Sequence, residues 1–110
     1  MSACRVFVVR KAFVVPRTHH VAVLVVDIHG QQRHRLFEHG SGIAVPRYLF
    51  RNPEDLIIED LGDTIKTIEN VEAYEKTLPK HYVLGARDCR HHARDILTFC
   101  GVDDDKITFL

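Results

Sequence analysis

The most restrictive feature of the sequence is a nearly continuous apolar run over residues 20–28, HVAVLVVDI, which is rich in β-branched side chains. A run of this length and composition is typical of a buried strand and is far too short to cross a membrane. A turn is expected near His29 and Gly30, after which residues 33–38 complete a hairpin. The sequence therefore predicts an antiparallel sheet at the centre of the fold.

Two further strands and a loop are expected outside this hairpin. Residues 5–15 alternate and cluster β-branched and aromatic side chains, which predicts one strand or a bent pair. Residues 44–55 contain two prolines, which favour an extended surface loop. Residues 56–62 are then expected to form a short strand.

Two helices are expected in the second half of the chain. Thr67 is a suitable N-cap for a helix that Pro79 ends. A last helix runs from Asp88 to Cys100, and Gly101 is the residue type expected just after it. One apolar stripe of this helix faces a core and consists of Cys89, Ala93, Ile96, Leu97 and Cys100.

Length and composition limit the classes of function. A chain of 110 residues without repeats or linkers is expected to form a single domain, 1–110. Its fifteen basic and fifteen acidic residues cancel, so no long-range field favours nucleic acid or an anionic membrane, and no segment is long and apolar enough to be an integral membrane span. Three scattered cysteines make a poor disulfide framework and predict an intracellular, cytoplasmic or nuclear, protein.

Cys89 occupies a position that favours thiol chemistry. With Asp88 as N-cap, Cys89 is the first helical residue, where the helix dipole lowers a thiol pKa from its usual value of about 8.5. The charge of Asp88 opposes this effect, so a histidine partner is needed. His91 and His92 project about 200 and 300 degrees away from Cys89 around a helix. His20, at the head of the apolar strand, is therefore the candidate base.

Six short stretches carry a resemblance that covers about seventy residues in order: HHVAVLV, HGSGI, LGDT, VEAYEKTL, HYVLGARDC and ILTFCG. Together they resemble the permuted papain-fold cysteine peptidases of the PPPDE group, which includes DeSI-type proteases that remove ubiquitin-like modifiers. The resemblance implies an α+β, permuted papain-like fold, in which a small antiparallel β-sheet packs against a C-terminal cysteine-bearing helix. It implies Cys89 as nucleophile and His20 as base, with Asp88 standing where the family usually has asparagine.

The stretch DCRHHARD also resembles the Asn-Cys-Glu-His-Phe segment of lecithin:retinol acyltransferase-like and NlpC/P60-like enzymes. The retinol group normally has a second histidine on the neighbouring strand, a place that His34 or His39 could fill. If the hairpin turns at residues 29 and 30, position 20 faces 39, so His39 is the better orienting candidate. His19 and Asp88 are the other candidates for an orienting or oxyanion-stabilising role.

Both resemblances imply the same chemistry. The thiolate of Cys89 attacks a carbonyl, His20 returns the proton to the leaving group, and backbone N–H groups at the start of the last helix stabilise the oxyanion. The sequence thus predicts a thiol hydrolase without a cofactor, acting on peptide or isopeptide bonds of a protein or peptide substrate, for example a ubiquitin-like modifier. The alternatives are an acyltransferase or thioesterase, or an inactive adaptor of the same fold, and a homodimer is compatible with each.

A zinc site is the remaining hypothesis for these residues. It would use Cys89, His91, His92 and Cys100. Zinc sites usually pair Cys-x2-Cys with His-x3-His, whereas two adjacent histidines diverge on a helix. We therefore expect no bound metal.

Overall fold

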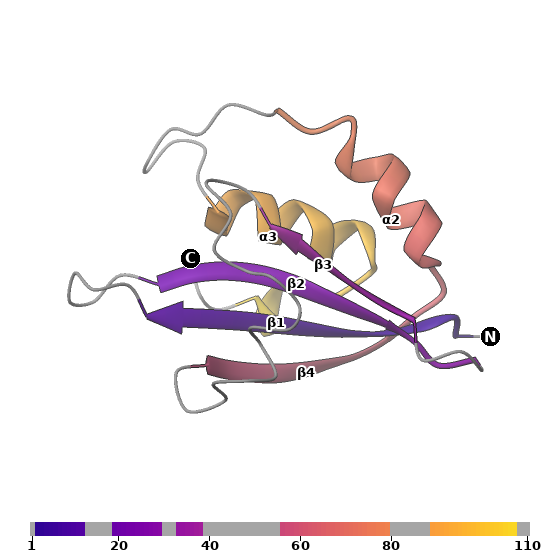
Figure 1. The fold of residues 1–110 in the computed structure, drawn as a ribbon, viewed down its shortest axis with the longest axis horizontal. Helices are drawn as coiled ribbons and strands as arrows, with labels where there is room; N and C mark the ends of the chain where they lie inside the picture. The colour runs from indigo at the N-terminus through magenta and orange to yellow at the C-terminus, as the bar shows by residue number, and fades with distance from the viewer. Residues whose placement is uncertain (1, 13–18, 30–32, 39–55, 80–88, 108–110) are drawn as a thin grey trace.

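An antiparallel sheet of four strands forms the centre of the computed structural model, which describes residues 2–12, 19–29, 33–38, 56–79 and 89–107 (Figure 1). The sheet order is β3-β2-β1-β4. The strands are β1 (Cys4–Ala12), β2 (His19–Asp27), β3 (His34–Glu38) and β4 (Leu56–Thr64). The predicted hairpin is confirmed as β2 and β3, and residues 5–12 belong to one continuous strand, not to a bent pair.

The pairing of β2 with β3 differs by one residue from the predicted register. In the structure Ala22 lies opposite Glu38 and Val26 lies opposite His34. The pattern continues where the N–H of Asp27 donates to the carbonyl oxygen of Arg33 at 2.8 Å. A turn centred on residues 29 and 30 would place Ala22 opposite Phe37, so the register of the described pairs differs from the prediction by one residue. The predicted partner of position 20, His39, lies outside the described residues.

The two faces of the sheet are sorted by the two-residue period of its strands. On one face the central strands contribute a layer of almost completely buried valines, namely Val6, Val8, Val21, Val23 and Val25. The other face carries a smaller apolar cluster formed by Phe7, Val9, Leu24, Val26 and Leu36. The valine face is the one that a helix covers.

The covering helix is α3 (Cys89–Phe99), which packs against β2 and β3, while α2 (Ile68–Glu75) packs against α3 and the same two strands (Figure 1). A short 3-10 helix, η2 (Asp104–Lys106), follows. All five residues of the predicted stripe of α3 are buried, and Gly101 has the positive φ of 84° that ends such a helix. Within the described ranges neither helix has the length and apolarity needed to cross a bilayer.

Strand β4 is longer than predicted. The sequence suggested an end at Gly62, because glycine commonly ends a strand. In the structure Gly62 has a φ of 96° and lies in a bulge, where the β1 register shifts between Arg5 and Phe7. Because only glycine adopts this φ without strain, the bulge explains the residue, and the strand continues to Thr64.

The start of α2 is fixed by a capping box. The side chain of Thr67 accepts from the N–H of Asn70 at 3.0 Å, and the side chain of Asn70 accepts from the N–H of Thr67, also at 3.0 Å. The predicted cap is thus confirmed, although α2 ends at Glu75, before it reaches Pro79. The two hydrogen bonds satisfy backbone donors that have no partner inside the helix.

We predict that Thr67→Ala lowers the free energy of unfolding by about 1 kcal/mol, the usual cost of losing an N-cap. Thr98→Ala is the matched control, since Thr98 is exposed in the last turn of α3 and alanine is a better helix former. Urea unfolding of the two variants checks this. Equal stability of both variants would show that the capping box contributes nothing.

Candidate active site

Cys89 is the first residue of α3, as the sequence predicts, and its side chain is turned into the core. Only 3% of its surface is exposed, and it belongs to the same apolar cluster as the valines of β1 and β2. The N–H groups of a first helical turn point toward the N-terminal end of the helix, where a developing negative charge is stabilised. The thiol is therefore placed for anion stabilisation but is enclosed.

The start of α3 lies at the end of the sheet where β2 begins. Figure 1 shows α3 and β2 starting at the same end, and the two elements are packed together along their length. Cys89 and Val21 are both members of the main core cluster. The backbone of the two residues before Val21, His19 and His20, is paired with β1. In the structure, α3 and β2 therefore begin at the same end of the domain.

The register along β2 distinguishes the two histidines. Alternate residues of a strand face opposite sides of a sheet. The β2 residues in the core beneath α3 are Val21, Val23 and Val25, whereas those in the cluster on the outer face are Leu24 and Val26. The pairing with β1 continues regularly to Ala12 and His19. By the alternation of the strand, position 19 therefore belongs to the face that α3 covers, and position 20 belongs to the outer face. The side chains of His19 and His20 lie outside the described part.

Of the other predicted site residues, His34 alone lies in the described part of the chain. Asp88 and His39 lie outside the described residues. His34 is exposed and lies opposite Val26, which is roughly 20 Å along the strand from position 20 at about 3.4 Å per residue. The structure therefore does not bring His34 to the head of β2.

The two remaining cysteines are poor nucleophiles. Burial raises the pKa of the Cys100 thiol to about 11, and the neighbouring thiol of Cys4 adds to the shift. Burial also raises the pKa of Cys4, with a further contribution from Asp27. Both residues are nearly inaccessible, at 5% and 1% exposure. Neither thiol is appreciably ionised near neutral pH.

His92 is the buried polar residue of α3 that the sequence analysis rejected as a partner of Cys89. An angle of 300 degrees around a helix is 60 degrees in the other direction, so a residue three positions after Cys89 shares its side of the helix. The structure buries His92 to 3% exposure, and its Nε2 donates to Oε2 of Glu75 in α2 at 3.0 Å. The expectation that His92 projects away from Cys89 is therefore wrong.

Glu75 belongs to a set of ion pairs that fasten α2. Its Oε1 lies 3.8 Å from a guanidinium nitrogen of Arg35, and a second nitrogen of Arg35 lies 3.6 Å from Glu72. Arg33 pairs with Glu69 one turn earlier. Strand β3 and the acidic face of α2 are thus complementary, and Glu75 also reaches the first turns of α3 through His92.

The four residues of the zinc hypothesis do not converge. Cys89 and Cys100 lie at opposite ends of α3, roughly 16 Å apart at about 1.5 Å per residue. His92 is engaged with Glu75. Among the described residues no group of three or more histidine, cysteine or acidic side chains is arranged to hold a metal ion. A zinc site built from these four residues is therefore excluded by the helix itself.

No family model, no curated protein and no solved structure matches the chain. The resemblance to permuted papain-fold peptidases accordingly stays a prediction from the order of the motifs. The structure gives a small α+β domain with a four-stranded antiparallel sheet and, in the described residues, two α-helices.

We predict that Glu75→Ala destabilises the fold by about 1–3 kcal/mol, because it removes the carboxylate acceptor of a buried histidine. Glu69→Ala is the matched control on the same helix, because the exposed pair of Glu69 with Arg33 contributes little to stability. The helix dipole favours Glu69 and disfavours Glu75, so it works against the predicted difference. If urea unfolding shows the Glu69 variant to be the less stable one, the pair with His92 does not stabilise the fold.

Proposed function

We propose that this protein is a thiol hydrolase of the permuted papain type, with Cys89 as the nucleophile. The observation that carries the proposal is the placement of Cys89 as the first residue of a helix that packs on β2 and starts at the same end of the domain as that strand (Figure 1). Two consecutive histidines open that strand. A thiol at a helix N-terminus with an imidazole nearby is the arrangement that activates cysteine in thiol hydrolases.

The base is one of the two histidines that open β2. The resemblance to known families favours His20. The register of β2 favours His19, whose position is on the face of the sheet that α3 covers. In either case the imidazole takes the thiol proton and later returns it to the leaving amine. Adjacent strand positions serve opposite faces, so one histidine acts and the other does not.

The acyl-transfer chemistry follows from the two elements. The thiolate of Cys89 attacks the carbonyl carbon of a peptide or isopeptide bond, which forms a tetrahedral oxyanion. The donors that we propose for this oxyanion are the N–H groups of the first turn of α3, including that of Cys89. The amine leaves with the proton from histidine, and water then hydrolyses the thioester with the same histidine as base.

The substrate we propose is a protein or peptide, for example one conjugated to a ubiquitin-like modifier, in a reducing intracellular compartment. The acyltransferase or thioesterase reading uses the same nucleophile and differs in the group that receives the acyl chain. The burial of Cys89 favours a second candidate, a domain that keeps this fold and binds a partner without turnover. Hydrolysis, like labelling of the folded protein, requires a local opening that makes the thiol accessible.

We predict that iodoacetamide labels Cys89 in the folded protein with an apparent pKa below the usual value of about 8.5. Cys4 and Cys100 stay unlabelled near pH 8, because burial raises both of their pKa values. Peptide mass spectrometry after timed labelling across pH measures this. His19→Ala and His20→Ala are each other's controls, since only the variant that removes the base raises the apparent pKa of Cys89. Labelling of Cys89 only after unfolding contradicts the enzyme proposal and supports the binding domain.

A second measurement separates the substrate classes. We expect ubiquitin-like proteins with an electrophilic C-terminus to form a covalent adduct at Cys89, detected by intact and peptide mass spectrometry. Small acyl electrophiles serve as the comparison, and Cys89→Ser is the control that loses every adduct. Adducts with the acyl electrophiles alone would favour the acyltransferase reading over the peptidase.

A further inference from the structure

A groove runs along β4, the strand at the edge of the sheet opposite to β3. Within the part of the chain that the structure describes, β4 pairs with β1 alone, so its second backbone edge faces outward. The groove has a volume of about 660 Å³ and lies between β4 and η2. A strand edge beside a groove is the geometry in which an extended peptide is bound by strand addition.

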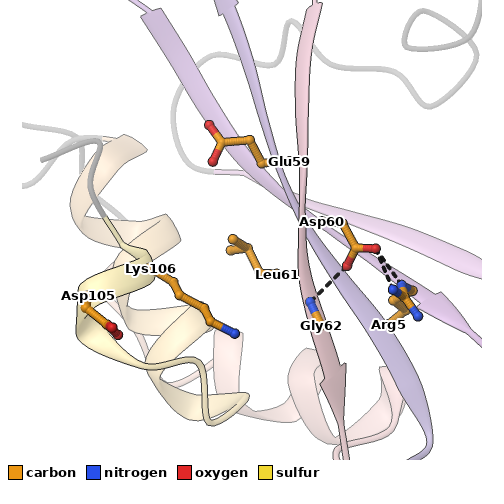
Figure 2. Close-up of a pocket in the computed structure, with 7 residues that line it drawn as sticks. All are labelled: Arg5, Glu59, Asp60, Leu61, Gly62, Asp105 and Lys106. Carbon is orange, nitrogen blue, oxygen red and sulfur yellow. Dashed lines mark hydrogen bonds and ion pairs between the residues drawn. The ribbon is translucent and has the colours of Figure 1, made fainter.

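The walls of the groove come from three elements (Figure 2). Glu59 and Leu61 project from β4 toward η2, and Lys106 projects back from η2 toward β4. Asp60 lies on the other side of the strand with Arg5, which pairs with it at 2.7 Å. Leu61 is 8% exposed and belongs to the main core, so it anchors the groove to the rigid part of the domain.

The acidic side chains of β4 form ion pairs, whereas those on the η2 side of the groove do not pair with any described residue. The acidic residues of β4 are already paired with β1, because Arg5 binds Asp60 and Asp63 and Arg10 binds Glu59. On the η2 side stand three exposed aspartates, residues 103–105, of which none forms an ion pair with a described residue. Lys106 is the single basic residue of η2. The unneutralised charge beside the β4 edge is therefore negative.

This charge also decides between possible occupants. Like charges close to each other destabilise a sheet, so the unneutralised aspartates of η2 disfavour an acidic strand at this edge and favour a basic one. The bulge at Gly62 further limits pairing at the end of the strand. The regular stretch before it, over residues 56–60, includes Ile58 with 48% exposure. An apolar and basic strand from another protein fits this edge.

We propose that the β4 edge binds an extended, basic segment of a partner protein by strand addition, with an arginine or lysine of the segment at Asp105. Backbone hydrogen bonds along residues 56–60 align the bound segment with β4, and the carboxylate of Asp105 in the groove wall favours a basic side chain on that segment. This binding site involves neither Cys89 nor the head of β2. It stands whether or not the proposed hydrolase activity does.

The test is an NMR titration of the full chain with a peptide of alternating threonine and arginine. We expect chemical-shift changes confined to β4 and η2, slower hydrogen exchange of β4 amides, and weaker binding at higher salt. The same peptide with alternate backbone nitrogens methylated carries an equal charge but cannot pair with the strand, so it should bind at least tenfold more weakly. A threonine and glutamate peptide should not bind.

Two variants complete the experiment. Asp105→Lys reverses a charge in the groove wall at an exposed position and should weaken binding by at least tenfold, while Ala73→Lys adds charge on the exposed side of α2 and should leave binding unchanged. Equal binding of the methylated peptide, shift changes away from β4, or no effect of Asp105→Lys would each overturn the proposal. Far-ultraviolet circular dichroism confirms that both variants are folded.

Discussion

The contact between the apolar stripe of α3 and the valine face of β1 and β2 is the interaction on which the rest of the structure depends. Val6, Val8, Val23 and Val25 on the sheet, and Ile96 and Leu97 on the helix, are almost completely buried in one cluster. Each such side chain contributes about 1.5–3 kcal/mol through removal from water. This contact sets the direction of α3 over β2, and so it decides which residues meet at the end where both begin.

The charged residues add orientation to this apolar contact. Arg33, just before β3, and Arg35, within it, pair with glutamates of α2, and Glu75 extends the set inward to His92, one helical turn beyond Cys89. Exposed pairs of this kind contribute little to stability, whereas the bond to a buried histidine fixes the position of one helix against the other. The cysteine end of α3 is thereby held from two sides, by the valine layer beneath it and by α2 beside it. The β4 edge lies outside this arrangement, and it is where we propose that a strand of a partner protein binds.

Periodicity predicted most of the fold because each element has a local signature. The stripe of α3, the Thr67 cap and the β2–β3 hairpin are all confirmed. The register of the hairpin was wrong by one residue, since register depends on how the loop closes, which composition does not encode. The role of Gly62 was missed because a bulge and a strand end use the same residue type. The contact between His92 and Glu75 was not predicted, because the two residues belong to different helices and no local sequence pattern indicates such a contact.

The proximity of the Cys89 thiol to an imidazole at the head of β2 is the central claim, and nuclear Overhauser effects test it most directly. In protein labelled selectively at cysteine and histidine, the account predicts a cross-peak between the β protons of Cys89 and the ring protons of either His19 or His20. Cross-peaks from Cys89 to aliphatic side chains alone, with none to either ring, would contradict it. The apolar packing would then remain, and the cysteine would be part of the core without a role in catalysis.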